Sequence, residues 1–322
     1  MSRTAGINYI IAMLLILTLN FILPRLMPSD PLQAIYGNEA MLAMTDELKA
    51  LLTSRFALDQ SPIEQFAAYW QALIRGDLGH SYYYNAPVIE VILGFLPWTV
   101  LLAGLALVIS TLLGVILGIE SGYRRGGKLD RFVLSGLMFF SGLPDFFLGV
   151  LLLLLFGVTL QLAPLSGAMT PYAGYTGLAL ALDVMHHLAL PLAALILARL
   201  TTTYLLTRST MIATLGEAFI ITARAKGCPE YNIRYRHAGK NALLPVFTAT
   251  GLQFTRLFTG ALFIEIVFTY PGMGTLLYNA LLTRDYPLLQ GILLLVAVVV
   301  LTINYLVDRL YPKIDPRVSH AR

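Results

Sequence analysis

Residues 98–119 read WTVLLAGLALVISTLLGVILGI, an apolar stretch without a charged side chain. A helix of about 20 apolar residues is long enough to cross a bilayer, so this stretch predicts a transmembrane helix. Comparable runs occur at about 7–23, 132–160, 187–207, 242–268 and 288–308. The sequence therefore predicts an all-α membrane protein with six transmembrane helices.

The composition of the chain also indicates a lipid environment. Of its 322 residues, 57% are hydrophobic and 12% are charged, whereas soluble domains carry about 45–50% and about 25%. The net charge of +4 is too small to suggest nucleic acid. The single cysteine, Cys228, excludes an internal disulfide framework and any multi-cysteine metal site.

Charge placement predicts the orientation and the domains. Lys and Arg gather in the connections after the second, fourth and sixth spans, and the positive-inside rule places these connections and both termini in the cytoplasm. No small-residue cleavage signature follows the first apolar run, so we expect it to be retained. We expect a first transmembrane helix at 1–27, an external segment at 28–96, and a five-helix membrane core at 97–322 with a cytoplasmic loop at 208–241.

The external segment is expected to contain short amphipathic helices. Ser61 and Glu64 have the spacing of a capping box, and Pro62 occupies the first helical position. This pattern predicts a helix that ends near Gly76, preceded by another helix near 46–54. Such a segment either docks a partner or is only a stabilised loop.

The sequence offers no catalytic constellation. No spacing among the histidines resembles a zinc site; they are His80, His186, His187, His237 and His320. Residues 122–128 imitate the start of a phosphate-binding loop, but Leu129 stands where the magnesium-binding Ser or Thr belongs. We therefore expect no enzyme and no cofactor in this chain, and a turn at the membrane edge at 122–128.

The most informative polar stretch runs from Leu215 to Pro245. Its helix-favouring residues continue up to Gly227, a natural helix stop, and Pro229 can open a second helix. The stretch predicts two short helices that meet at a glycine. A loop this long and helical is expected to contact a partner, although a basic helix pair lying on anionic lipid is the alternative.

This loop resembles the EAA loop of ABC importer permeases, in the form found in the dipeptide, oligopeptide and nickel family. The similarity rests on residues 222–227, TARAKG, and 236–245, RHAGKNALLP. Further stretches similar to the B-type subunit of that family are found at 27–31, 58–62, 75–79, 96–99, 143–149, 265–274, 284–287 and 308–317. The generic Glu-Ala-Ala triplet is replaced by Ile221, Thr222 and Ala223.

The resemblance implies a type I ABC importer. It implies a heterodimer with a C-type permease, two cytoplasmic ATPase subunits that hold ATP and magnesium, and an external solute-binding protein. The coupling loop that would seat in an ATPase consists of Glu217, Thr222, Ala223, Arg224, Ala225, Lys226, Gly227 and Pro245. Small peptides, nickel, other metal chelates and opine-like metallophores all remain open as substrates.

Three charged residues fall within predicted spans, where ionisable groups are costly and usually face a partner or an aqueous path. These residues, which are the candidates for the substrate path, are Arg199, Arg256 and Glu265. The arginines are candidates for attracting substrate carboxylates, with an interhelical salt bridge or a snorkelling side chain as the alternative. For Glu265 a structural hydrogen bond is the favoured interpretation. A self-sufficient secondary transporter would need matched broken helices and a carboxylate relay, and no inverted repeat is visible.

Overall fold

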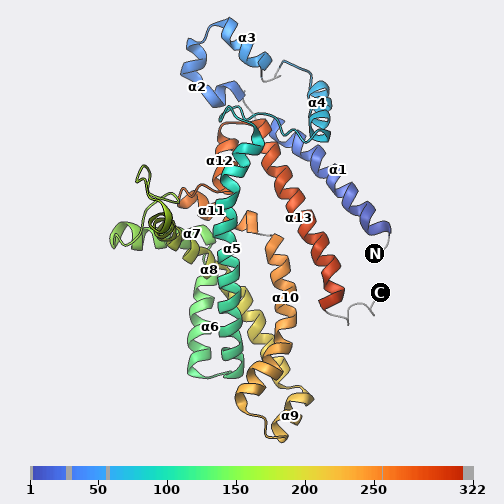
Figure 1. Ribbon diagram of the computed structural model, residues 1–322, viewed down its shortest axis with the longest axis vertical. Coiled ribbons are helices and arrows are strands. Elements are labelled where there is room, and N and C mark those ends of the chain that lie inside the picture. The colour runs from blue at the N-terminus through green and yellow to red at the C-terminus, as the bar shows by residue number, and fades with distance from the viewer. Residues whose placement is uncertain (1–2, 27–30, 56–58, 256, 315–322) are drawn as a thin grey trace. The chain divides into compact units, whose positions relative to one another are not determined.

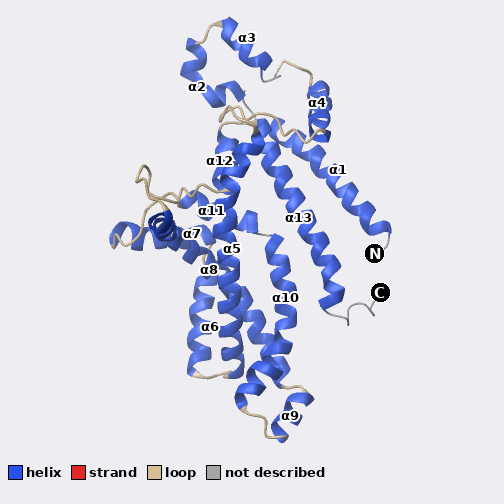
Figure 2. Cartoon of the chain, viewed as in Figure 1, coloured by secondary structure: helices blue, strands red, loops and turns tan. Residues whose placement is uncertain are grey.

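The computed structural model describes residues 3–26, 31–55, 59–255 and 257–314, and the regular secondary structure of these residues is helical (Figures 1 and 2). The helices are α1 (Arg3–Arg25), α2 (Pro31–Ala43), α3 (Asp46–Arg55), α4 (Pro62–Ile74), α5 (Val88–Tyr123), α6 (Lys128–Ser141), α7 (Asp145–Leu152), the π-helical η1 (Leu153–Thr159), α8 (Gly177–Leu215), α9 (Ala218–Ala225), the π-helical η2 (Asn232–Gly239), α10 (Lys240–Thr255), α11 (Leu257–Val267), α12 (Met273–Leu282) and α13 (Tyr286–Ile314).

The expected all-α membrane fold is confirmed at this level. Within the described residues, α5, α8 and the part of α13 from 286 to 306 are long and apolar enough to cross a membrane. The pair formed by α6 and the α7–η1 segment adds a fourth candidate span. The count of six spans stays a prediction, as do the domain boundaries at 27 and 96.

Both helices expected near 46–54 and from Pro62 are present, as α3 and α4. Ser61 Oγ accepts the Glu64 N–H at 3.3 Å, and Glu64 Oε2 accepts the Ser61 N–H at 2.8 Å. This second bond holds the pKa of the Glu64 carboxyl below its ordinary value. The helix stops at Gly76, whose φ of 75° is a left-handed conformation that suits glycine.

Internal contacts divide the chain into two compact units. The first comprises residues 1–97 with 272–301, and the second comprises residues 98–271 with 302–322. In the first unit, the start of α5 packs against α12 and the start of α13 around a core that includes Ile92, Leu276 and Leu288. Asn20 Nδ2 of α1 donates to the Gln290 carbonyl of α13 at 2.8 Å, which joins these two helices (Figure 1).

In the second unit, α5 and α8 approach so closely that only glycine fits between them. Gly114, Gly118 and Gly122 recur every four residues along α5 and face Thr203, Thr207 and Met211 of α8. A Cβ atom built at these glycines would lie 2.8, 2.5 and 2.8 Å from the nearest α8 side-chain atom. Small residues at this spacing let two helix backbones meet in lipid, so this seam fixes the pairing of α5 with α8.

The predicted span at 132–160 is not one straight helix. It is divided into α6 and the α7–η1 segment, which meet at an angle of 102°. Pro144 lies between them and has no N–H for a helical hydrogen bond, and it also disfavours helical geometry at Leu143. The apolar composition alone therefore predicted the length of this segment but not its bend.

Candidate functional site

The predicted coupling residues from 217 to 227 lie on a helical loop of the second unit. We call residues 216–239 the α9–η2 loop. It begins with α9 and turns at Gly227, whose φ is 71°. The next helical residue is Glu230, one position after Pro229. The prediction of a short helix that ends at a glycine is therefore confirmed, but the second helix is not short, because η2 continues directly into α10.

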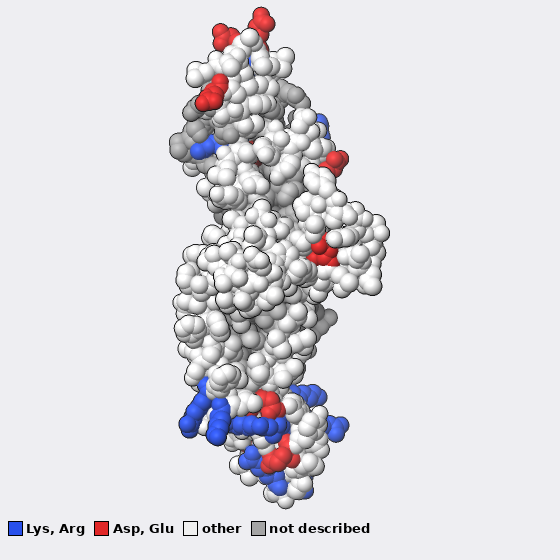
Figure 3. Space-filling view, turned by 90° about the vertical axis from the view of Figure 1, so that its left-hand side faces the viewer, with Lys and Arg blue, Asp and Glu red and all other residues white. Residues whose placement is uncertain are grey.

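The α9–η2 loop carries exposed apolar side chains among basic ones. Phe219, Ile221 and Tyr231 are 43%, 63% and 70% exposed, and Phe219 and Ile221 flank the buried Ile220 on opposite sides of α9. Arg224 and Lys226 are also exposed. Figure 3 shows Lys and Arg side chains gathered at the end of the second unit that carries this loop.

Most of the predicted coupling residues are accessible on the surface of this loop. The exposed ones are Glu217, Thr222, Arg224, Ala225, Lys226 and Gly227. Ala223 is only 7% exposed and faces the interior of its own chain. Pro245 is exposed but belongs to α10, outside the loop. The structure therefore brings together the residues from 217 to 227 and separates Pro245 from them.

The opposite face of the loop is anchored to the spans by an apolar cluster. Ile220 of α9 and Ile233 of η2 are both at most 1% exposed. They pack with Ile119 of α5, Met211 of α8 and Ala242 of α10. Burial of such side chains is worth roughly 1.5–3 kcal/mol each, so the loop is held against the ends of these helices.

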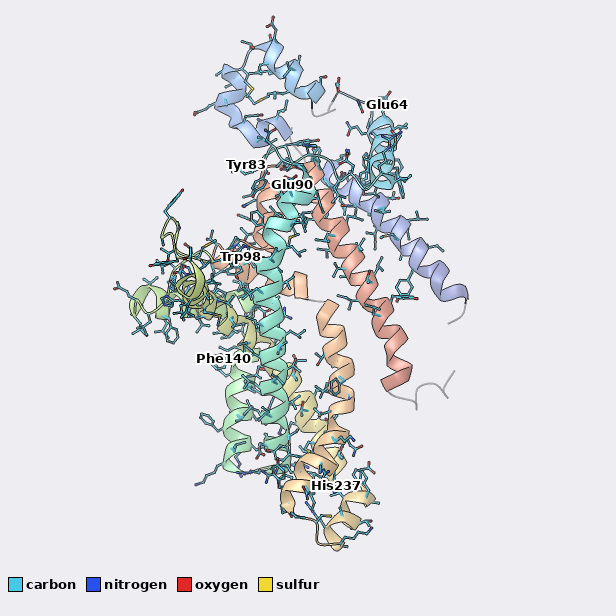
Figure 4. All side chains as sticks on the ribbon, viewed as in Figure 1. Glu64, Tyr83, Glu90, Trp98, Phe140 and His237 are labelled. Carbon is cyan, nitrogen blue, oxygen red and sulfur yellow. The ribbon has the colours of Figure 1, made fainter. Side chains whose placement is uncertain are left out.

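A polar network reinforces this anchor. Arg234 Nη1 of η2 donates to both carboxylate oxygens of Glu120 on α5, at 2.9 and 3.1 Å. The Tyr235 hydroxyl also donates to Glu120, and this hydrogen bond, with burial, raises the pKa of Tyr235. The Arg234 guanidinium carbon lies 4.2 Å from the centre of the Tyr123 ring. His237 lies on the same π-helical segment (Figure 4).

A second ion pair joins α6 to α8 just before the loop. Arg208 donates to both oxygens of Asp130, from Nε at 2.6 Å and from Nη2 at 2.9 Å. The Gly126 N–H donates to Asp130 at 2.8 Å, and the Ser121 hydroxyl donates to it as well. Residues 122–128 thus contain the predicted turn, and α8 extends through Arg208, which the sequence had placed in the loop.

These two networks were missed by the sequence reasoning. Glu120 and Arg234 are separated by 114 positions, and no local spacing reveals such a pair. A signal existed in Glu120 and Asp130 themselves, because carboxylates at the edges of apolar helices need partners. The predicted loop contains many basic residues, so the sequence did not indicate which of them pairs with Glu120 and which with Asp130.

Replacing Glu120 with glutamine is expected to loosen the α9–η2 loop. The substitution keeps the size of the side chain but removes the charge that accepts hydrogen bonds from Arg234 and Tyr235, which is worth roughly 1.5–3 kcal/mol for a charged acceptor. Amide hydrogen exchange over residues 216–239 should become at least about tenfold faster. Glu217→Gln, at an exposed position, is the matched control; equal exchange in both variants would contradict the anchoring role.

The three intramembrane charges are found in different surroundings. Glu265 is completely buried, and its Oε1 accepts the Thr99 hydroxyl at 2.6 Å. Arg199 is half-buried on α8 and interacts electrostatically with Asp145. Arg256 lies outside the described residues. The favoured hydrogen-bonding interpretation of Glu265 agrees with its bond to Thr99, while the interpretations of Arg199 and any role in the substrate path stay predictions.

The histidines that the structure describes do not form a metal site. In these residues no group of three or more His, Cys, Asp or Glu side chains could hold a metal ion. His187 Nδ1 lies 2.9 Å from the Asp183 carbonyl oxygen, and His186 Nε2 lies 3.0 Å from the Leu162 carbonyl oxygen. Both rings thus have hydrogen-bonding partners on the main chain.

Comparison with known proteins places this architecture among transport components. The model of the family described as "Binding-protein-dependent transport system inner membrane component" matches residues 110–320. The matched range includes the α5–α8 seam and the whole α9–η2 loop.

Curated relatives cover nearly the whole chain. A provisionally named peptide transport system permease protein of Brucella abortus is 36% identical over 309 residues, which are 96% of this chain and 95% of the relative. A provisionally named peptide permease protein of Brucella suis is 37% identical over 312 residues and 96% of both chains. The dipeptide transport system permease protein DppB of Escherichia coli is 32% identical over 321 residues and 94% of both chains.

Proposed function

The chain belongs to the family of inner membrane components of binding-protein-dependent transport systems, and from this premise we propose that it is the B-type pore subunit of an ATP-driven importer of small peptides. The expected resemblance to ABC importer permeases of the dipeptide and oligopeptide type is confirmed. A permease of this family is a multi-pass membrane subunit and is not itself an enzyme.

The observation that carries the proposal is the two-faced α9–η2 loop. It exposes Phe219, Ile221 and Arg224, while Ile220 and Ile233 fix its buried side to α5 and α8. Exposed apolar side chains beside basic ones suit docking to another protein. A loop of this kind receives a partner on one side and passes the displacement to the spans on the other.

In the proposed assembly, a C-type permease completes the pore, and one of two ATPase subunits binds α9. The ATPases hold ATP and magnesium, and an external binding protein delivers the solute. Closure of the ATPase pair would move the α9–η2 loop and, through Glu120 and the apolar cluster, shift α5 and α8 between inward-open and outward-open arrangements. Both termini would lie in the cytoplasm of a prokaryotic cell, whose inner membrane holds the subunit.

Peptides are the favoured substrate because the curated relatives are named as peptide and dipeptide permeases. Arg199 and Arg256 would then be available to attract the carboxylate of a peptide C-terminus. Nickel and metal chelates were equally open on the sequence alone, and no described residue cluster favours a metal.

Uptake into vesicles tests the proposal directly. The chain is co-expressed with its genomic neighbours, and labelled di- to pentapeptides are offered beside free and chelated nickel, with and without internal ATP. We expect ATP-dependent uptake of peptides. ATP-dependent uptake of nickel alone would overturn the substrate, and uptake driven by a proton gradient without ATP would overturn the importer in favour of a secondary transporter.

A further inference from the structure

The first unit contains a pocket that the proposed transport cycle does not use. Its volume is about 260 Å³. The end of α1, one face of α4, the connection at 77–82 and the first turns of α13 enclose it, and all of them belong to the same compact unit. Figure 1 shows these helices, and Figure 4 labels Glu64 near the start of α4.

One end of this pocket carries a positive charge without a counter-ion. Arg25 is half-buried, its Nε donates to Gln65 Oε1 at 2.9 Å, and its Nη1 donates to the Phe21 carbonyl at 3.0 Å. Both acceptors are neutral, and among the described residues Arg25 forms no ion pair. A guanidinium withdrawn from water without a carboxylate partner favours an anion, and it matches phosphate and carboxylate geometry best.

A buried amide side chain lies beside the same pocket. Gln290 is only 8% exposed and lines the pocket, yet its Nε2 has no hydrogen-bond partner. Asn20 fixes the backbone at this position by donating to the Gln290 carbonyl at 2.8 Å. An unsatisfied buried donor costs roughly 1–3 kcal/mol, so a ligand oxygen that reached this amide after a rotation of the side chain would recover that free energy.

Gln60 and the carboxylate Asp77 also line the pocket, and another part of it is apolar and follows the candidate membrane span α13. Ala72 and Leu73 of α4 and Leu294 of α13 form this part. From Pro287 to Leu294 the lining descends α13 by seven positions, which is about 10 Å of helix. A small water-soluble anion would contact Arg25 but not the apolar part of the pocket. An amphipathic anion could contact Arg25 with its charged group and the apolar part with its hydrocarbon chain.

We propose that this pocket binds a membrane phospholipid. The phosphate lies against Arg25, and the first carbons of an acyl chain lie against Ala72 and Leu294. Tyr69 and Tyr82 also line the pocket, and tyrosine is enriched where a protein meets the headgroup layer. The bound lipid would join α1, α4 and α13, and this role is independent of the proposed substrate.

Native mass spectrometry of the delipidated full-length chain in detergent tests this site. Dioleoylphosphatidylglycerol and dioleoylphosphatidylethanolamine are titrated separately, because both carry the phosphate that Arg25 would bind. Arg25→Gln is expected to weaken retention of both lipids at least about tenfold. Arg75→Gln changes an exposed arginine of the same segment that does not line the pocket, and it should retain lipid as the unmodified chain does.

A second variant separates binding from folding. Ala72→Leu fills the apolar part from the surface helix α4 and leaves Arg25 in place, so it should also reduce retention while the melting temperature without lipid stays unchanged. Equal lipid retention by all variants would overturn the proposal. Displacement of the lipid by dialanine, if it depends on Arg25, would also overturn the proposal, because the pocket would then be a solute site.

Discussion

Replacing Gly118 with alanine is expected to destabilise the protein by about 1–3 kcal/mol, even though alanine is the better helix former by about 1 kcal/mol. The added Cβ would lie 2.5 Å from Thr207 Cβ and 3.0 Å from the Tyr204 carbonyl oxygen. The backbone oxygen cannot rotate away, so α5 and α8 must separate. The loss should appear as a melting temperature several degrees lower in detergent.

Gly104 provides the matched control for this substitution. It belongs to the same helix α5, and a Cβ atom there would have no neighbour within 4 Å. Gly104→Ala should therefore be neutral or slightly stabilising, because it removes only the conformational freedom of glycine. If both alanine variants melt at the same temperature, the close seam between α5 and α8 does not determine stability.

Replacing Gly227 with leucine is expected to reduce transport at least about tenfold while ATP hydrolysis by the assembled complex continues. The residue has a φ of 71°, and a Cβ atom there would meet nothing within 4 Å. The expected effect therefore comes from backbone strain alone, roughly 1–2 kcal/mol for a side chain in the left-handed region. That strain would alter the turn after α9, which the proposed ATPase contact requires. The ratio of solute transported to ATP hydrolysed measures the result.

Two variants make this prediction specific. Gly227→Asn should retain most transport, because asparagine tolerates the left-handed region better than other residues. Gly216→Ala changes the glycine before α9, whose φ of −83° is ordinary for any residue, and it should have little effect. Normal transport by Gly227→Leu would show that the turn geometry does not matter for coupling.

Local features of the chain could be predicted from its sequence because their causes are local. The capping box at Ser61 and Glu64 and the left-handed Gly227 depend on residues only a few positions apart, and both are present in the structure. The apolar runs likewise predicted membrane-length helices, since bilayer thickness sets a minimum length. These features need no knowledge of which helices are neighbours.

Features that depend on long-range pairing could not be predicted in this way. The bond between Glu120 and Arg234 and the pocket between Arg25 and Gln290 join residues from distant parts of the sequence. The recurrence of glycine every four residues at Gly114, Gly118 and Gly122 was visible in the sequence, but the helix that packs against these glycines was not. The bend at 142–144 also required the structure, although Pro144 marked the place.

The seam between α5 and α8 also has a mechanical consequence. Three glycines allow the two backbones to touch over two helical turns, and the Ile220 and Ile233 side chains join the α9–η2 loop to the same end. The paired helices α5 and α8 and the α9–η2 loop are therefore packed tightly enough to restrict movement of one relative to another. We therefore expect a displacement of α9 to rotate α5 and α8 together rather than to bend the α9–η2 loop.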